Sequence, residues 1–297
     1  MAEICPTTRT ERILLSTDGS EYSEGAIREA IRLSKKCSSR LSIISVIETN
    51  PELEAIAPQV TEKAERAVKA HLDTVQARAK QEGVESEVVI HEGEDSYKYI
   101  VDEAARRKST MVVMGRRGRT GLKRLMMGSV TARVIGHAPC NVLVVPKAAH
   151  FECKNILVAT DGSRFGDAAA REAIGMAKQC KSRLTILSVA PSESVSPMDI
   201  VHSQMQRDLI AAQELTMAEA NVKKAKAAAA KDGVDAEGMI YGGKPPEAII
   251  QAAKDISADL IVLGSHGKTG VEKLLMGSVA ERVIVLASCG VLVVKEK

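Results

Sequence analysis

The chain contains the same stretch of sequence twice, and this repetition constrains its fold more than any other feature. Residues 12–46 match residues 155–189 at an offset of 143, and residues 111–145 match residues 260–294 at an offset of 149. Self-similarity over such a length indicates two copies of one structural unit. The length of 297 residues also suits two domains of about 150 residues each.

The difference between the two offsets places a short insertion outside the repeated cores. It falls between Val46 and Gly93, where polar, proline-containing segments occupy equivalent places in the two copies. Such segments are typical of surface connections. The two cores are therefore equal in size, and the junction at 146–154 separates them. We expect one domain over residues 1–148 and a second over residues 149–297.

Each copy alternates between two hydrophobic patterns. In the first copy, short runs rich in branched residues predict five strands, at 13–16, 41–47, 86–92, 110–115 and 141–145. Several of these runs are apolar almost throughout, which is typical of strands covered on both faces. Helical patterns lie between them. We therefore predict an α/β fold of two tandem Rossmann-like domains, each a five-stranded parallel sheet with helices on both faces.

One helical pattern is especially regular. Its apolar residues recur at spacings of three and four, at Val60, Ala64, Ala67, Val68, Leu72, Val75 and Ala79. Gly83 is expected to end this helix, and Gly233 to end its counterpart in the second copy.

The last strand of each copy is expected at an edge of its sheet. An exposed apolar edge favours aggregation unless it is paired. We therefore expect residues 141–145 to pair with residues 290–294, which would make the chain an internal pseudo-dimer. The alternative is that both strands lie inside their own sheets.

Composition excludes several classes of partner. The 41 basic residues nearly cancel the 38 acidic ones, for a net charge of +3, and aromatic residues make up 2% with no tryptophan. Neither the charge nor the aromatic content favours binding to nucleic acid or to an anionic membrane. No apolar run approaches the roughly 20 residues of a membrane span, and the N-terminus lacks a signal-peptide pattern. These features predict a cytoplasmic protein.

The six cysteines contain no C-x-x-C pair. Cys37, Cys140, Cys180 and Cys289 each lie beside apolar segments and are interpreted as small buried residues in a reducing compartment. We expect neither a disulfide nor a metal site.

Two segments of each copy are expected to meet where the strands end, which is where open α/β sheets bind ligands. The first is the sequence TDGS at 17–20, repeated at 160–163. Asp-Gly makes a good turn, and Ser20 and Ser163 are good N-caps for the following helix. A purely structural role is therefore the alternative for this segment.

The second segment carries the pattern G-x2-G-x9-G-S at 115–129 and again at 264–278. The first two glycines allow backbone to approach a ligand without a Cβ, and the Gly-Ser pair offers backbone N–H groups and a helix N-terminus to a phosphate. Turns and caps are again the alternative, and duplication alone would preserve them. Basic side chains stand in these loops, namely Arg116, Arg117, Arg119, Lys268 and His266. Met126, Met127 and Met276 precede the Gly-Ser pairs and are interpreted as core residues.

On these motifs both halves resemble the universal stress protein family, in particular its ATP-binding branch, whose pattern is G-x2-G-x9-G-[S/T]. The resemblance implies the strand order 3-2-1-4-5 in each half, which places the last strand at an edge. It also implies ATP as the ligand, with Mg²⁺ as an optional companion. Asp18 and Asp161 would lie beside the adenine and ribose, and Val46 and Val189 would contact the adenine through their backbone.

The resemblance implies further contacts in both halves. Ribose and phosphates would be lined by Gly115, Gly118, Gly264 and Gly267, and the phosphates would be held by Gly128, Ser129, Gly277 and Ser278. The remaining expected contacts are Thr17, Met114, Arg117, Val130, Thr160, Leu263, His266 and Val279. The loop GSHGKTG of the second half looks like typical ATP-binding members. The loop GRRGRTG of the first half departs from them, and its arginines would tighten phosphate binding or favour more highly phosphorylated ligands.

These observations predict a cytoplasmic stress-response protein that binds ATP or a related adenine nucleotide in each half and acts as a nucleotide-dependent regulator. A further homodimer of the tandem chain is left open. We expect no catalytic residue and no metal ligand. The alternative function is a slow ATPase or nucleotide-transferring enzyme, although the Walker pattern is absent and Asp18 and Asp161 are the only repeated acidic residues near the site. A phospho-receiver domain is a third interpretation, weakened because Asp18 lacks an acidic neighbour at its strand end.

Overall fold

The computed structural model describes Cys5, residues 10–50, Glu52 and residues 56–118, 126–190, 204–268 and 276–296. The first half contains β1 (Arg12–Ser16), η1 (Glu21–Ser23), α1 (Glu24–Cys37), β2 (Arg40–Glu48), α3 (Pro58–Gln81), β3 (Ser86–Gly93), α4 (Ser96–Arg106), β4 (Met111–Gly115), α5 (Ser129–His137) and β5 (Asn141–Val145). The second half contains β6 (Asn155–Ala159), α6 (Arg164–Cys180), β7 (Arg183–Ala190), α7 (Gln204–Lys231), β8 (Ala236–Gly242), α8 (Pro245–Asp255), β9 (Leu260–Gly264), α9 (Ser278–Leu286) and β10 (Gly290–Val294). The proline-containing stretch of the second copy falls on residues 191–203, outside the described residues.

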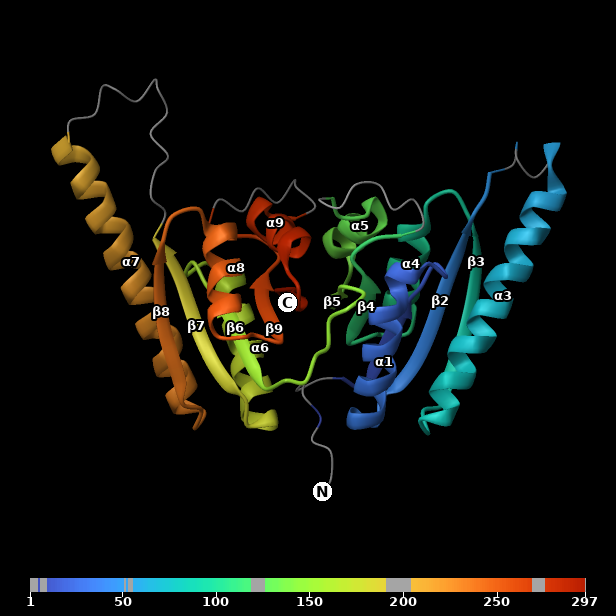
Figure 1. Ribbon diagram of the computed structural model, residues 1–297, viewed down its shortest axis with the longest axis horizontal. Coiled ribbons are helices and arrows are strands. Elements are labelled where there is room, and N and C mark those ends of the chain that lie inside the picture. Colours follow the sequence, from blue (N-terminus) through green and yellow to red (C-terminus); the bar gives the residue numbers. More distant parts are fainter. Residues whose placement is uncertain are drawn as a thin grey trace.

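All ten strands form one sheet, in the order β3-β2-β1-β4-β5-β10-β9-β6-β7-β8. Among the described strands, pairing is parallel within each half, and one antiparallel pair joins β5 to β10, with Leu143 opposite Leu292. Each half therefore has the order 3-2-1-4-5, as predicted, and the expected pairing of the two last strands is confirmed. Figure 1 shows the two halves on either side of this central junction, with the linker between them at the bottom.

Helices cover both faces of the sheet and create two hydrophobic cores. Successive residues of a strand point to opposite faces, so Leu15 belongs to one core and its neighbour Leu14 to the other. The first core is covered by α1, α3, α6 and α7, and the second by α4, α5, α8 and α9. Burial on both faces explains why strands such as β4 and β10 are apolar along their whole length.

The long helix α3 follows its predicted stripe only in part. Val68, Leu72, Val75 and Ala79 are buried, whereas Val60 is 51% exposed and Ala67 is also exposed. The apolar face is exposed at these two positions because the first turns of α3 extend past the sheet (Figure 1), and because Ala67 lies beside the buried residue Val68.

Two glycines follow the long helices as predicted. Gly83 and Gly233 adopt φ values of +76° and +74°, two residues after α3 and α7 end. Few other residues tolerate this left-handed conformation, which turns the chain back towards the sheet.

Two cations also join the halves, each at the end of a helix from the opposite half. The guanidinium of Arg116 caps the last turn of α9, where it donates to the carbonyl oxygens of Ile284 (3.2 Å), Val285 (2.8 Å) and Ala287 (2.8 Å). The ammonium of Lys295 caps α5, where it donates to the carbonyl oxygens of Ile135 (2.8 Å) and Gly136 (3.0 Å). A positive charge at a helix C-terminus is stabilising, so each half contributes to the stability of the other.

Cysteine pairing differs from the prediction. Cys5 and Cys37 form a disulfide, so the interpretation of Cys37 as a buried thiol was wrong. The bond depends on where the N-terminal segment runs, and no periodic pattern in the sequence indicates that path. Cys140 and Cys289 are buried thiols outside any disulfide, as expected, while Cys180 is partly exposed. No helix in the described parts of the chain is both long enough and apolar enough to span a membrane.

Candidate functional site

The turn after β6 positions the first predicted segment of the second half. Gly162 has a φ of +78°, and the Asp161 carboxylate accepts the Ser163 N–H through Oδ1 at 3.0 Å. Ser163 in turn caps α6, because its hydroxyl accepts the Gly166 N–H at 3.1 Å. The predicted turn and N-cap are therefore both present in this half.

The equivalent turn of the first half is built differently. The Ser20 hydroxyl donates to Asp18 Oδ1 at 2.7 Å and makes no cap bond, and the 3₁₀ turn η1 precedes α1. The prediction of Ser20 as a side-chain N-cap was therefore wrong. A Cβ at Gly166 would lie 2.8 Å from Thr160 Oγ1, and the equivalent residue Ser23 carries a Cβ, so the first half cannot use the same tight turn.

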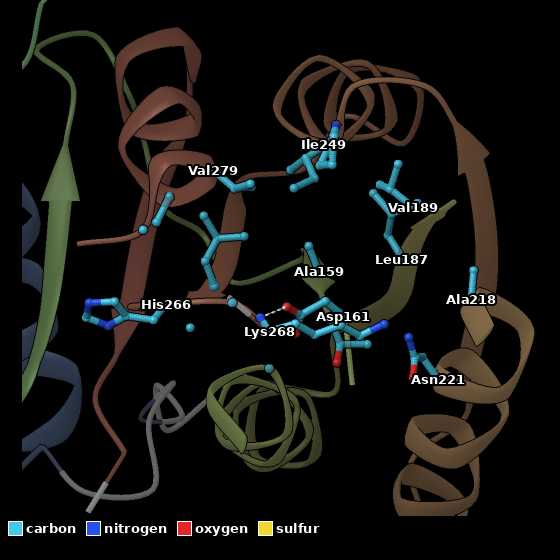
Figure 2. A pocket seen from close by; sticks show the side chains of 18 of the residues that line it. Ala159, Asp161, Leu187, Val189, Ala218, Asn221, Ile249, His266, Lys268 and Val279 are labelled. Carbon is cyan, nitrogen blue, oxygen red and sulfur yellow. Dashed lines mark hydrogen bonds between the residues drawn. The ribbon is translucent and has the colours of Figure 1, made fainter. Parts of the chain in front are cut away.

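The glycine loop follows β9 and lies against the Asp161 turn. Asp161 Oδ2 accepts the Lys268 N–H at 2.7 Å, the contact marked by the dashed line in Figure 2. A Cβ at Gly267 would lie 2.8 Å from the same oxygen, and one at Gly264 would lie 2.7 Å from the backbone of Phe165. These two glycines are thus required by contacts within the chain itself, a role that the ligand-approach argument did not include.

The loop of the first half repeats this arrangement. A Cβ at Gly118 would lie 2.9 Å from Asp18 Oδ2, and one at Gly115 would lie 2.7 Å from the Tyr22 carbonyl oxygen. Both loops therefore place an aspartate against the second glycine of the pattern.

Each Gly-Ser pair begins a helix, as predicted. Gly128 and Gly277 are the N-cap residues of α5 and α9, neither of which has a side-chain cap bond. The first N–H groups of an α-helix have no partner within the helix. In the second half these groups lie at the edge of a cavity, because Gly277 and Ser278 line it.

That cavity has a volume of about 350 Å³ and lies entirely within the second half. Figure 2 shows Ala159, Leu187, Val189, Ile249 and Val279 on its apolar side, with Asp161 and Lys268 at the other end. All the contacts predicted for this half line it: Thr160, Asp161, Val189, Leu263, Gly264, His266, Gly267, Gly277, Ser278 and Val279. A volume of this size is at the lower end of the range for small-molecule sites.

Several lining residues were not predicted. One wall comes from α7, through Glu214, Met217, Ala218 and Asn221, and others come from Gly166 and Ile249. The four α7 residues have helical spacing, and three of their equivalents, Ala64, Ala67 and Val68, belong to the apolar face predicted for the helix of the first half. A sequence pattern identifies the inward stripe of a helix, but it does not distinguish a stripe that faces the sheet from one that faces a cavity.

The first half places its predicted contacts at equivalent positions: Thr17 and Asp18 after β1, Val46 in β2, Met114 and Gly115 in β4, Arg117 and Gly118 in the loop, and Gly128, Ser129 and Val130 at the start of α5. The interior between them is occupied differently. Thr17 Oγ1 lies 2.9 Å from Ser23 Oγ and 3.0 Å from His71 Nε2. Ser23, Val68 and His71 stand where the second half has the smaller residues Gly166, Ala218 and Asn221. At the rim the first half has the smaller side chains, because Ala64 and Ala67 stand where the second half has Glu214 and Met217.

The basic residues of the two loops have diverged. Arg116 was expected beside phosphates, but its guanidinium binds α9, and burial of that side chain lowers its pKa. The Arg117 side chain is partly exposed and donates to the Met126 carbonyl oxygen at 3.4 Å, and Arg119 lies outside the described residues. In the second half Lys268 lines the cavity, while the His266 ring contacts Phe165, with 5.2 Å between ring centroids, and extends away from Asp161 (Figure 2).

The methionines before the Gly-Ser pairs also differ from one another. Met276 is buried and Met127 packs against the same core, as predicted. Met126 is 59% exposed, so its interpretation as a core residue was wrong; it lies at the outer surface of the loop, before the chain reaches α5. Among the described residues, no group of three or more His, Cys, Asp or Glu side chains is arranged to hold a metal ion.

Comparisons with known proteins agree with this architecture. The family model described as "Universal stress protein family" matches residues 9–146 and again residues 152–295. A universal stress protein of Methanocaldococcus jannaschii is 38% identical over 143 residues, which cover 48% of this chain and 82% of that protein. The crystal structure of a universal stress protein from Archaeoglobus fulgidus aligns with a TM-score of 0.73 and 22% identity over 98% of both chains, a likeness of fold. With two matches that together span nearly its whole length, the chain belongs to the universal stress protein family.

Proposed function

We propose that the second half binds ATP in the cavity between β6, β7, β9 and α7, and that the protein acts as a nucleotide-dependent regulator in the cytoplasm. The observation that carries this proposal is the convergence of an apolar pocket, a glycine loop and a helix N-terminus on one cavity of about 350 Å³. The apolar end suits a purine base, and the helix end suits phosphates.

The backbone of Val189 supports the position proposed for the base. The Leu187 carbonyl oxygen accepts the Thr160 N–H at 2.9 Å, so it points towards β6. Alternate residues of a strand point the same way, and the N–H and C=O of Val189 therefore face the same side. Because β6 ends at Ala159, they face the cavity rather than another strand. A donor and an acceptor placed side by side match the edge of an adenine ring.

The opposite end of the cavity supports the position proposed for the phosphates. Gly277 and Ser278 begin α9 there, and Lys268 contributes a cation from the glycine loop. Backbone N–H groups, a hydroxyl and a positive side chain are the usual partners of phosphate oxygens. Any Mg²⁺ would arrive on the nucleotide and be held chiefly by phosphate oxygens and water. Asp161, which accepts the Lys268 N–H, is proposed to contact the ribose.

We propose that the first half binds the same class of ligand more weakly. It keeps Asp18, the glycines and the Ser129 helix start, but Ser23, Val68 and His71 occupy space that is open in the second half. Arg116 is bound to α9 and is not directed at a ligand in its own half, which removes one of the charges expected to favour a more highly phosphorylated ligand.

Calorimetric titration with ATP tests the proposal. We expect one tight site per chain, assigned to the second half, and a second site at least about tenfold weaker, which corresponds to about 1.4 kcal/mol. Mass spectrometry of nucleotide that copurifies with the chain gives an independent reading. The proposal would be falsified if no binding is detected up to about 1 mM ATP and no nucleotide copurifies with the chain. A Kd of about 1 mM corresponds to a binding free energy of about −4 kcal/mol.

Slow ATP hydrolysis is the second candidate, favoured by the repeated aspartate beside the loop. Phosphate release by the wild type and by Asp161→Ala distinguishes the two. Release at about 1 s⁻¹ or faster that is lost in the variant would favour the enzyme, whereas regulation by binding alone predicts slower release.

A further inference from the structure

Helices α1 and α6 occupy equivalent places in the two halves, and both end at a cysteine, Cys37 in the first and Cys180 in the second. In each case the next residue adopts a left-handed conformation, with φ of +50° at Ser38 and +55° at Lys181. The two sulfur atoms therefore stand at matching positions near the linker. Cys37 is bonded to Cys5, whereas Cys180 is a free thiol.

Cys153 supplies the second half with a partner for Cys180. In the first half Thr10 Oγ1 lies 3.5 Å from the Cys37 sulfur, and the Ser39 hydroxyl donates to the Thr10 carbonyl oxygen. In the second half the Ser182 hydroxyl donates to the Cys153 carbonyl oxygen in the same way. Cys153 thus takes the place of Thr10, and its sulfur lies 3.6 Å from the Ser182 hydroxyl oxygen. By this equivalence it faces the Cys180 sulfur as Thr10 faces that of Cys37, and each thiol shifts the pKa of the other.

The two thiols of this pair differ in exposure and in the direction of their pKa shifts. Cys153 is 4% exposed, and its hydrogen bond to Cys180 together with burial raises its pKa. Cys180 is partly exposed, and the hydrogen bond from Cys153 lowers its pKa, helped by Ser182 and by the positive charge of Lys36. The thiolate is the nucleophile of cysteine chemistry, so Cys180 is the attacking thiol and Cys153 is the second, resolving thiol.

We propose that Cys153 and Cys180 form a thiol–disulfide exchange site that is oxidised by low-molecular-weight disulfides. The Cys180 thiolate attacks one sulfur of the small disulfide, an S–S bond forms, and the other half leaves as a thiolate that takes up a proton. Cys153 then loses its proton and attacks the Cys180 sulfur, which releases the second small thiol. The protein loses two electrons and two protons, and the small disulfide is reduced to two thiols.

The cysteine pair lies at the far ends of two elements that lead to the cavity. Cys153 lies two residues before β6, and Cys180 ends α6. At their other ends β6 leads to Asp161 and α6 begins beside Gly166, both of which line the cavity. Oxidation would tie together the far ends of the two elements that shape one side of that cavity.

Peptide mass spectrometry of the full chain tests the proposal. The reduced protein is incubated under native conditions with oxidised glutathione, quenched in acid, alkylated and digested. We expect a peptide pair joined through Cys153 and Cys180, with Cys140 and Cys289 alkylated only after unfolding, because they are buried. A stable glutathione adduct as the end product, or two unreacted thiols, would overturn the proposal.

Cys153→Thr is the matched variant, because it installs the residue that the first half has at this position. It should stop at the mixed disulfide between Cys180 and glutathione, and thermal unfolding checks that it folds. Cys180→Ser should form neither species at Cys153. As a second readout, Cys180 of the wild type should react with iodoacetamide at least about tenfold faster than Cys140 or Cys289. Equal rates for the three thiols would contradict the assignment of Cys180 as the attacking group.

Discussion

The two halves share one fold and one set of glycines, yet they differ in the side chains that lie behind the glycine loop. In the second half Gly166, Ala218 and Asn221 leave a cavity open beside Asp161. In the first half Ser23 and His71 converge on the Thr17 hydroxyl. The comparison teaches that a glycine motif fixes the course of a loop, whereas the residues behind the loop decide how much room a ligand finds.

The largest expected effect separates the two glycine loops. Gly267→Val should weaken ATP binding at the second half by about 100-fold or more, about 2.7 kcal/mol, because a Cβ there meets Asp161 Oδ2 at 2.8 Å. Gly118→Val is the matched change in the first half and should leave the tight site intact. Calorimetric titration of both variants measures the difference. Equal loss in the two variants would mean that the halves do not bind independently.

The next effect concerns the two cations that cross between the halves. Arg116→Ala should lower the free energy of unfolding by about 2–3 kcal/mol, because it removes a charged donor from three carbonyl oxygens of α9. Lys295→Ala removes two such bonds and should cost about 1–2 kcal/mol. Urea unfolding measures both. Arg117→Ala serves as the control, because that side chain is partly exposed and makes one long bond to a carbonyl oxygen of its own loop, and it should change stability by about 0.5 kcal/mol or less.

A third difference is acid sensitivity. In the first half Glu103 is buried beside Arg106, at 2.5 Å, and Arg107, and hydrogen bonds from these two arginines lower its pKa from 4.5 to about 2. The equivalent residue in the second half is Ala252. A carboxyl group whose pKa is lowered by folding stabilises the protein when the pH is above the ordinary pKa of that group. This stability is lost as the pH falls from about 4.5 towards 2.

Glu103→Gln should therefore destabilise the protein by about 2 kcal/mol near neutral pH, with the difference from wild type shrinking below pH 4.5. Unfolding curves collected across this range check the expectation. A difference that stays constant down to about pH 2 would show that the ionised carboxylate is not the stabilising form.

The smallest effect tests the filling of the cavity itself. The double variant Ala218→Val and Asn221→His gives α7 the residues of α3, and should weaken ATP binding by about tenfold through lost space. The reverse pair, Val68→Ala and His71→Asn, should strengthen the weaker site by a similar factor. A fluorescent ATP analogue reports both. No change in either direction would mean that these helix positions do not explain the difference between the halves.

Much of this architecture could be predicted from the sequence. The spacing of apolar residues predicted the strands, and the cost of an exposed edge predicted the pairing of β5 with β10. The strand order within each half was implied by the family resemblance. The contacts predicted for the second half all line one cavity, because carboxyl ends of parallel strands meet at one side of a sheet.

The features that escaped prediction depend on where elements lie relative to one another. Asn221 lines the cavity only because of the rotation of α7 about its axis. The Arg116 side chain points away from its own glycine loop because α9 of the other half lies within hydrogen-bonding distance. The Cys5–Cys37 bond depends on the path of the N-terminal segment. None of these relations has a periodic signature in the sequence.

The antiparallel junction between β5 and β10 has a consequence for how such a chain can evolve. In a dimer of identical subunits every substitution appears twice, so a change that suits one site is imposed on both. Here the two subunits are joined in one chain, with fixed stoichiometry at any concentration. Each copy has therefore been able to acquire its own residues, and the two helix caps are made by an arginine in one direction and a lysine in the other. After duplication the two backbones have stayed symmetric, while the side chains of the two copies have diverged.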